Sequence, residues 1–289
     1  MIAPYGHLLR TCTILVSLGL ASTVPAQDGP KRLADAIDPD WAKASLWDDG
    51  QAEVATYEGE RVIYGEARPH THHLITVKED FNRDFMVKAD WPYDDKPLMT
   101  VLKQNQVATI PTPNYPYHYM ASVFFDREDI GRAVKMTVSS QEWCGITTKD
   151  VQFWEEPPVY RYTSYWDGQG MGEAKVPEAA AENTFFEEEL PLLVRTLEFG
   201  DELELEFELM PNQTTSRAKK PDPVEAQARV TREEDAGWRI AVRAADGREL
   251  NFTVANDEVN TLRAYSLGEG RSYTLANVER WPYWERRPE

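Results

Sequence analysis

Apolar and acidic residues alternate without a break along residues 201–209, where the sequence reads DELELEFEL. Successive side chains of an extended chain point to opposite faces, so this period of two predicts a strand with one apolar face and one acidic face. The row of glutamates has two interpretations, a calcium-binding row or a solvated charge ladder. The ladder is the more common arrangement, and arginines on adjoining strands would offset the repulsion by about 0.2–1 kcal/mol per pair.

The same period of two continues in residues 224–231, 238–243 and 250–254, with turn-forming residues between these segments. We expect these segments to form an antiparallel meander with residues 201–209, and its apolar face to be the hollow side of a bent sheet. The inward row is expected to include Leu203, Leu205, Phe207, Trp238, Ile240 and Phe252.

Residues 51–166 carry further short segments rich in Val, Ile, Thr, Tyr and Phe. Clusters of Gly, Pro, Asn and Asp separate these segments, and such short separations suit hairpins better than parallel crossovers, which need a dozen or more residues. Residues 110–119 contain three prolines and predict a loop or a sheet edge. The predicted strands are 51–57, 60–67, 71–78, 98–109, 117–126, 133–142, 146–155 and 158–166.

Residues 184–198 have the clearest helical pattern. Thr184 and Glu187 have the spacing of a capping box, acids fill the first turn, and Pro191 would kink or divide the helix. The apolar stripe of this segment needs a sheet to cover it. The sequence therefore predicts a mainly β protein, with curved antiparallel sheets in a half-barrel or meander and one main helix near residues 184–198.

The first 26 residues are typical of a signal peptide. An apolar stretch at residues 11–20 is followed by Val24 and Ala26, which suit the small-residue positions of a signal-peptidase site. A buried N-terminal helix is the alternative, and Pro25 disfavours it. We expect a periplasmic or secreted protein. The rest of the chain is expected to divide into a lead-in segment (27–50), an N-terminal β region (51–170), a linker with the helix (171–200) and a C-terminal meander (201–289).

Asp and Glu number 49 against 31 Lys and Arg, which gives a formal net charge of −18. This excess of negative charge repels the phosphates of nucleic acids, so we expect no nucleic-acid partner. No run of 18 apolar residues occurs, so we expect no membrane span. Only Cys144 of the two cysteines remains once the signal peptide is removed, so the mature chain cannot form an intramolecular disulfide.

Cys144 is one candidate catalytic residue, in the sequence SSQEWCG at the end of a predicted strand. A thiolate nucleophile needs a base or a cation nearby to lower its pKa, and His118 is the histidine in the most similar context. A lone cysteine is more often a small buried apolar residue, and this is the alternative interpretation.

His70 and His72 are a second candidate pair, for a metal site. In an extended chain these two side chains point to one face and His73 points to the other. Two imidazoles at this spacing can share Zn²⁺ or Cu²⁺, but a coordination shell needs a third or fourth ligand. The alternative is a solvated or hydrogen-bonded histidine cluster.

The nine tryptophans have two interpretations. Exposed tryptophans could stack on sugar rings, whereas buried ones would fill the core of a large sheet. The sequence leaves both interpretations open for Trp143, Trp154, Trp166, Trp281 and Trp284. The chain contains no nucleotide-binding loop, no Gly-x-Ser-x-Gly elbow and no tandem cysteine pair, so we expect no cofactor.

Four strings carry a resemblance to a known family: YEGERVIYG, IPTPNYPYHYMASVFF, SSQEWCG and LPLLVRTLEFG. Over residues 44–280 the chain resembles a family of uncharacterised exported bacterial proteins, some of which carry the label septum formation inhibitor Maf. The Maf nucleotide pyrophosphatases have a Ser-x-Ser-x-Arg segment near their start, and nothing in this chain matches it, so the label implies no activity. The helix followed by a meander is similar to half-barrel envelope proteins related to lipoprotein carriers. That resemblance implies a concave sheet face able to hold an apolar ligand.

Two hypotheses of function follow. The first is a non-enzymatic binding or carrier module of the cell envelope, in which the inward row accepts an apolar small molecule or docks an envelope protein. The second is a hydrolase that depends on Cys144 or on a metal held by His70 and His72. Glycan binding through exposed tryptophans is a further alternative.

Overall fold

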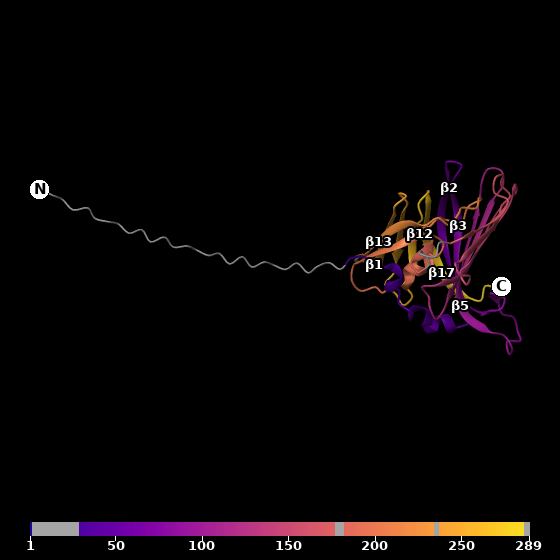
Figure 1. Ribbon diagram of the computed structural model, residues 1–289, viewed down its shortest axis with the longest axis horizontal. Coiled ribbons are helices and arrows are strands. Elements are labelled where there is room, and N and C mark those ends of the chain that lie inside the picture. Colours follow the sequence, from indigo (N-terminus) through magenta and orange to yellow (C-terminus); the bar gives the residue numbers. More distant parts are fainter. Residues whose placement is uncertain (2–28, 177–181, 234–236, 286–289) are drawn as a thin grey trace.

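The computed structural model describes residue 1 and residues 29–176, 182–233 and 237–285. All strands of the described residues belong to one large curved sheet (Figure 1). Apart from Met1, the predicted signal peptide lies outside the described residues, so export remains a prediction.

The N-terminal strands follow one another as antiparallel hairpins. They are β2 (Ala52–Ile63), β3 (Glu66–Asn82), β5 (Leu98–Ile110), β6 (Tyr117–Asp126), β7 (Ala133–Glu142), β8 (Gly145–Gln152), β9 (Val159–Thr163) and β10 (Met171–Lys175). The short strand β4 (Val87–Lys88) pairs with the end of β3. The hairpins predicted from the Gly, Pro, Asn and Asp clusters are therefore present.

The C-terminal strands form the predicted meander. They are β12 (Leu203–Met210), β13 (Val224–Glu233), β14 (Gly237–Ala244), β15 (Glu249–Val254), β16 (Leu262–Ser266) and β17 (Arg271–Trp281). Strand β17 pairs antiparallel with β2, so the two β regions form a single sheet.

The free side of β12 carries two short parallel partners, β1 (Lys31–Arg32) and β11 (Thr184–Phe186). These two pairs make the sheet mixed, and the sheet does not close on itself. The predicted class, mainly β with curved antiparallel strands and a helix, is confirmed.

Side chains of the C-terminal meander alternate as their two-residue period predicts. Leu205 and Phe207 are buried, whereas Glu204 and Glu206 are exposed. Arg229 of β13 lies opposite Glu204 and forms an ion pair with Glu202 (3.5 Å), which is the predicted offset of the glutamate row.

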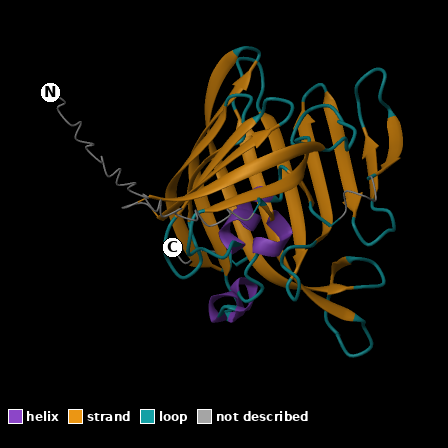
Figure 2. Cartoon of the chain, turned by 60° about the vertical axis from the view of Figure 1, so that its left-hand side comes forward, coloured by secondary structure: helices purple, strands orange, loops and turns teal. Residues whose placement is uncertain are grey.

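The concave face of the sheet surrounds one short α-helix, α1 (Leu190–Leu193), and the 3-10 turn η5 (Val194–Thr196) (Figure 2). The helix is shorter than the predicted 184–198. Instead of capping a helix, Thr184 donates a hydrogen bond to Glu208 (3.1 Å). Phe185 and Phe186 instead pair with the edge of β12. This pairing gives hydrogen-bond partners to backbone groups that an unpaired edge strand would expose.

One end of the half-barrel is filled by the lead-in segment, which folds into the 3-10 turns η1 (Leu33–Ala36), η2 (Trp41–Lys43) and η3 (Ser45–Asp48). Trp41 and Trp47 are buried there, and Ile37 forms a β-bridge with Leu197. We call the opposite end, where the β2–β3 turn and the β12–β13 loop (residues 211–223) lie, the open end. Within the described residues, no helix has the length and apolar character needed to cross a membrane.

Candidate functional site

A cavity of about 400 Å³ lies at the open end, and we call it the mouth. It is bounded by the ends of β2 and β6, by the β9–β10 loop and by the β12–β13 loop. Its lining residues are Arg61, Val62, Ile63, Tyr64, Tyr117, Tyr119, Glu142, Trp166, Thr215, Ser216, Arg217 and Lys219.

The mouth is locally cationic. Arg61 donates from Nη2 to the carbonyl oxygen of Thr214 (2.7 Å), and its guanidinium lies 4.4 Å from the centre of the Tyr119 ring. The guanidinium of Arg217 lies 5.0 Å from the centre of the Trp166 ring. Neither arginine forms an ion pair with a carboxylate in the part of the chain that the structure describes. Two cations without carboxylate partners in one cavity of an acidic protein create a local field that attracts anions.

Three cations, Arg61, Arg217 and Lys219, line the mouth against one acid, Glu142, so the cations outnumber the acids. Lys219 lies 3.7 Å from Glu269, and both side chains are substantially exposed, so solvent screens this pair. Glu142 is the acid that lines the cavity.

Aromatic rings form the apolar part of the mouth. The hydroxyl groups of Tyr64 and Tyr117 are hydrogen bonded to each other. Burial raises the pKa of Tyr117, so its phenol stays protonated, and burial also raises the pKa of Tyr119. Beyond the lining residues, Tyr115 stacks on Trp143 with 5.4 Å between ring centres and 12° between planes. Aromatic faces next to unpaired cations suit a ligand with a ring and a negative charge.

A second and much smaller cavity of about 20 Å³ lies inside the sheet, and we call it the chamber. It shares Arg61 and Tyr119 with the mouth, so these two side chains separate the two spaces. The other lining residues are His72, Gln106, Ala108, Glu187, Glu188, Asn212, Thr214, Tyr265, Leu267, Arg271 and Tyr273. A space of this size holds about one water-sized group.

His72 points into the chamber from β3, and aromatic rings hold it in place. The centre of its ring lies 4.6 Å from that of Tyr273 and 6.3 Å from that of Tyr265. Burial lowers the pKa of His72 to about 3, so the imidazole is neutral near pH 7. Gly59 makes this packing possible, because a Cβ atom there would lie 3.0 Å from Nε2 of His70 and from Cδ1 of Tyr273.

Three consecutive glutamates, Glu187, Glu188 and Glu189, lie between β11 and α1 and are all buried. Glu187 faces the guanidiniums of Arg271 (2.5 Å) and Arg248 (3.3 Å). Burial raises the pKa of Glu187, and these two cations oppose the shift. Without such cations a buried carboxylate would give up its charge, so the pairing explains how Glu187 is accommodated.

The other two glutamates bind backbone groups. Oε1 of Glu188 accepts hydrogen bonds from the amides of Gln213 (2.6 Å) and Thr214 (2.7 Å). Oε2 of Glu189 accepts a hydrogen bond from the amide of Phe186 (2.6 Å). Burial raises the pKa of Glu189 to about 8, so this carboxyl is largely protonated at neutral pH.

Lys149 fixes the β12–β13 loop from the other side. Its ammonium group donates to the carbonyl oxygens of Gln213 and Thr215 (2.6 Å) and to the hydroxyl of Thr215 (3.2 Å). Tyr160 donates to the side-chain oxygen of Gln213 (3.0 Å). Burial lowers the pKa of Lys149 to about 7, against the opposing effect of Glu188. The loop between mouth and chamber is thus held by buried polar side chains.

The predicted inward row lies in the main core. Leu205, Phe207, Trp238, Ile240 and Phe252 are buried in the same hydrophobic cluster as α1, and Leu203 is partly buried against it. The three cavities described here are lined by other residues. Ligand binding by this row stays a prediction.

The two members of the catalytic candidate have different hydrogen-bond partners in the structure. Cys144 is exposed in the β7–β8 turn, and its Sγ atom lies 2.9 Å from the hydroxyl of Tyr115. His118 is exposed on β6 and its Nδ1 atom is hydrogen bonded to Thr109 (3.0 Å). No hydrogen bond joins Cys144 to His118 within the described residues.

The histidines lie on the two faces that the alternation predicts. His70 and His72 point inward with 6.4 Å between ring centres, and His73 binds Thr56 (3.1 Å) on the other face. The described ranges contain no group of three or more His, Cys, Asp or Glu side chains that could hold a metal ion.

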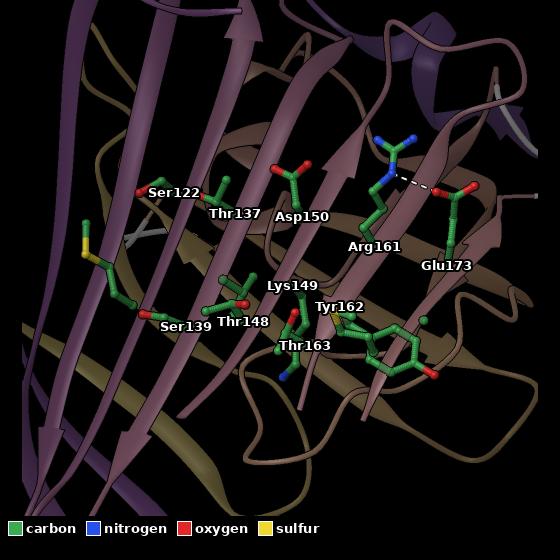
Figure 3. Close-up of a pocket in the computed structure, with 14 residues that line it drawn as sticks. Ser122, Thr137, Ser139, Thr148, Lys149, Asp150, Arg161, Tyr162, Thr163 and Glu173 are labelled. Carbon is green, nitrogen blue, oxygen red and sulfur yellow. Dashed lines mark hydrogen bonds and ion pairs between the residues drawn. The ribbon is translucent and has the colours of Figure 1, made fainter. Parts of the chain in front are cut away.

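A third cavity, an open groove of about 730 Å³, lies on the sheet formed by β6–β10, and Figure 3 shows the side chains that line it. One row of side chains crosses neighbouring strands at paired positions: Ser122, Thr137, Asp150, Arg161 and Glu173. Two cations line this groove. Arg161 donates to Glu173 (2.7 Å), and the ammonium group of Lys149 donates to the carbonyl oxygen of Thr215 (2.6 Å), so both already have partners. This groove therefore has less attraction for a charged ligand than the mouth.

The polar residues of the mouth and the chamber were not predicted from the sequence. Arg61 and Arg271 were not among the candidate site residues, and the run Glu187–Glu189 was interpreted as the first turn of a helix. The sequence does contain one indication of their burial. This run of acids lies between the apolar residues FF and LPLL, and acids that are closely flanked by buried apolar residues are buried with them.

Comparison with models of protein families, with the sequences of curated proteins and with solved structures finds no match to this chain.

Proposed function

We propose that this protein is an exported binding or carrier module, and that its ligand is a small anion with a ring or another planar apolar part. The observation that carries the proposal is the composition of the mouth. Among the described residues, Arg61 and Arg217 have no carboxylate partner there, and they lie beside Tyr119 and Trp166 in a chain whose net charge is −18. A ligand in the mouth would place its negative group on the guanidiniums and its ring against the aromatic wall.

The mouth is favoured over the inward row because that row already packs against α1. An additional ligand there would have to displace side chains of a close-packed core. The mouth is open to solvent and needs no such displacement. A volume of about 400 Å³ falls within the ordinary range of small-molecule sites.

Titration calorimetry with benzoate and with benzyl alcohol tests the proposal. The two probes share a ring and differ in charge, so benzoate should bind about tenfold more tightly if a charge-assisted hydrogen bond of about 1.5 kcal/mol forms. Arg217→Gln should weaken benzoate binding by a similar factor. Arg263→Gln, which removes an exposed cation on β16, is the matched control and should have no effect. Equal binding of the two probes, or equal benzoate binding by wild type and Arg217→Gln, would contradict the proposal.

A further inference from the structure

The chamber next to the mouth contains buried polar atoms that the protein leaves without partners. Neither ring nitrogen of His72 has a hydrogen-bond partner within the described residues, and the same holds for Oε2 of Glu188, Nδ2 of Asn212 and Nε of Arg271. These four side chains are 6%, 3%, 3% and 4% exposed and all line the chamber. Buried polar atoms in folded proteins almost always have a partner, so such a cluster around one small space points to a polar group that occupies it.

The free atoms define the kind of group that fits. Asn212 Nδ2 and Arg271 Nε are donors, Glu188 Oε2 is an acceptor, and the neutral ring of His72 supplies one of each. The guanidinium of Arg271 forms an ion pair with Glu187 (2.5 Å), so the charge that carries the free donor Nε is already compensated. The chamber therefore suits a neutral group that both donates and accepts, and its volume of about 20 Å³ limits that group to the size of a hydroxyl.

Arg61 connects this chamber to the mouth. Its guanidinium rests on Tyr119 and donates to the carbonyl oxygen of Thr214, a neutral acceptor. A carboxylate in the mouth is a stronger acceptor than a backbone carbonyl, so it would draw Arg61 away from Thr214. Because Arg61 and Tyr119 form the shared wall, this movement joins the two spaces.

We infer that the chamber is the inner subsite of the mouth and that it receives a hydroxyl group of the ligand, which makes the ligand a hydroxylated ring anion of the sugar-acid class. This inference rests on the proposed function. The carboxylate would lie on the cations of the mouth, the C–H face of the sugar ring would pack on an aromatic ring there, and one hydroxyl would enter the chamber.

Titration calorimetry with D-glucuronate and cyclohexanecarboxylate separates the two subsites. Both probes are six-membered-ring carboxylates, and only glucuronate carries hydroxyls. Wild-type protein should bind glucuronate about tenfold more tightly. His72→Phe removes both ring nitrogens. Asn212→Leu removes the free donor, adds no charge and leaves the Thr214 amide its hydrogen bond to Glu188, so each variant should abolish this preference while cyclohexanecarboxylate binding stays within about twofold. Asn212→Leu decides the result if His72→Phe does not fold.

The possible outcomes distinguish a failure of the inner subsite from a failure of the proposed function. Equal binding of the two probes, or a preference for glucuronate that survives in a folded chamber variant, would overturn the inner subsite. A chamber variant that weakens both probes equally would overturn it as well. If neither probe binds, or if Arg217→Gln leaves both affinities unchanged, the proposed function itself fails.

Discussion

Arg195 and Glu53 lie 142 residues apart in the sequence and form a buried two-point ion pair, with Nη1 2.7 Å from Oε1 and Nη2 3.0 Å from Oε2. Arg195 follows α1 and Glu53 is on β2, so the pair ties the segment inside the half-barrel to the middle of the sheet. The indole of Trp41 lies 5.2 Å from the guanidinium. The end of the half-barrel that the lead-in segment fills, which we call the closed end, thus contains a desolvated charge pair.

Removal of one partner of this buried pair should therefore lower the free energy of unfolding far more than removal of an exposed charge. Glu53→Gln leaves a buried guanidinium uncompensated, and we expect the free energy of unfolding to fall by about 3–5 kcal/mol. Glu202→Gln is the control, because its pair with Arg229 is exposed and should contribute about 0.5 kcal/mol or less. Denaturant titration measures both. A loss below about 1 kcal/mol in Glu53→Gln would show that this pair does not hold the closed end together.

The fold was largely predictable because its strands obey a local rule. A period of two is visible in any short window, and Leu205 and Phe207 are buried while Glu204 and Glu206 are exposed, as that period requires. The helix was predicted too long because the first part of its segment pairs with β12. Helix propensity depends only on the residues of the segment itself. It carries no information on the edge of β12, which lies beside residues 184–186 only in the folded protein.

The candidate site was not predictable in the same way. Glu187 can be buried because it pairs with Arg271, at the start of β17, and with Arg248, in the β14–β15 turn. Both arginines are far from Glu187 in the sequence, so the local pattern does not predict these pairs. The mouth likewise brings together Arg61, Tyr119 and Arg217 from different parts of the chain. The order of the strands in the sheet decides which distant residues come together in such a site. The hydrophobic pattern predicts the strands, but it does not predict which strand ends lie next to the β12–β13 loop.

The alternation of the meander predicts opposite effects for neighbouring residues of β12. Phe207→Ala removes a buried ring from the main core and should lower the free energy of unfolding by about 3–5 kcal/mol. Glu206→Ala changes an exposed side chain and should stay within about 0.5 kcal/mol of wild type. Thermal or denaturant unfolding compares the two. If Glu206→Ala were the more damaging change, the assignment of the two faces would be wrong.

Glu189 should make stability depend on pH. Its pKa is raised from 4.5 to about 8, so between these values the folded state holds a proton that the unfolded state has released, and stability falls as the pH rises. Relative to Glu189→Gln, which cannot titrate, wild-type protein should lose up to about 1.4 kcal/mol per pH unit in this window. Glu198→Gln, at an exposed position, should follow the wild-type curve. Parallel curves for wild type and Glu189→Gln would refute the raised pKa.

Lys149 should control the order of the β12–β13 loop. Lys149→Met leaves the carbonyl oxygens of Gln213 and Thr215 without their donor, so the loop should open more often. We expect hydrogen exchange of the loop amides to accelerate by about tenfold or more, which corresponds to the loss of about 1.4 kcal/mol of local stability. Lys175→Met changes an exposed lysine on β10 and should leave the loop amides unchanged. Unaltered exchange in Lys149→Met would mean that other contacts hold the loop.

The most direct measurement is a crystal structure of the protein with benzoate bound. We expect the carboxylate within hydrogen-bond distance of Arg61 or Arg217 and the ring against an aromatic side chain of the mouth. Benzoate bound in the groove of β6–β10, or against the inward row of β12 and β14 while the mouth holds none, would contradict the assignment of the mouth as the ligand site.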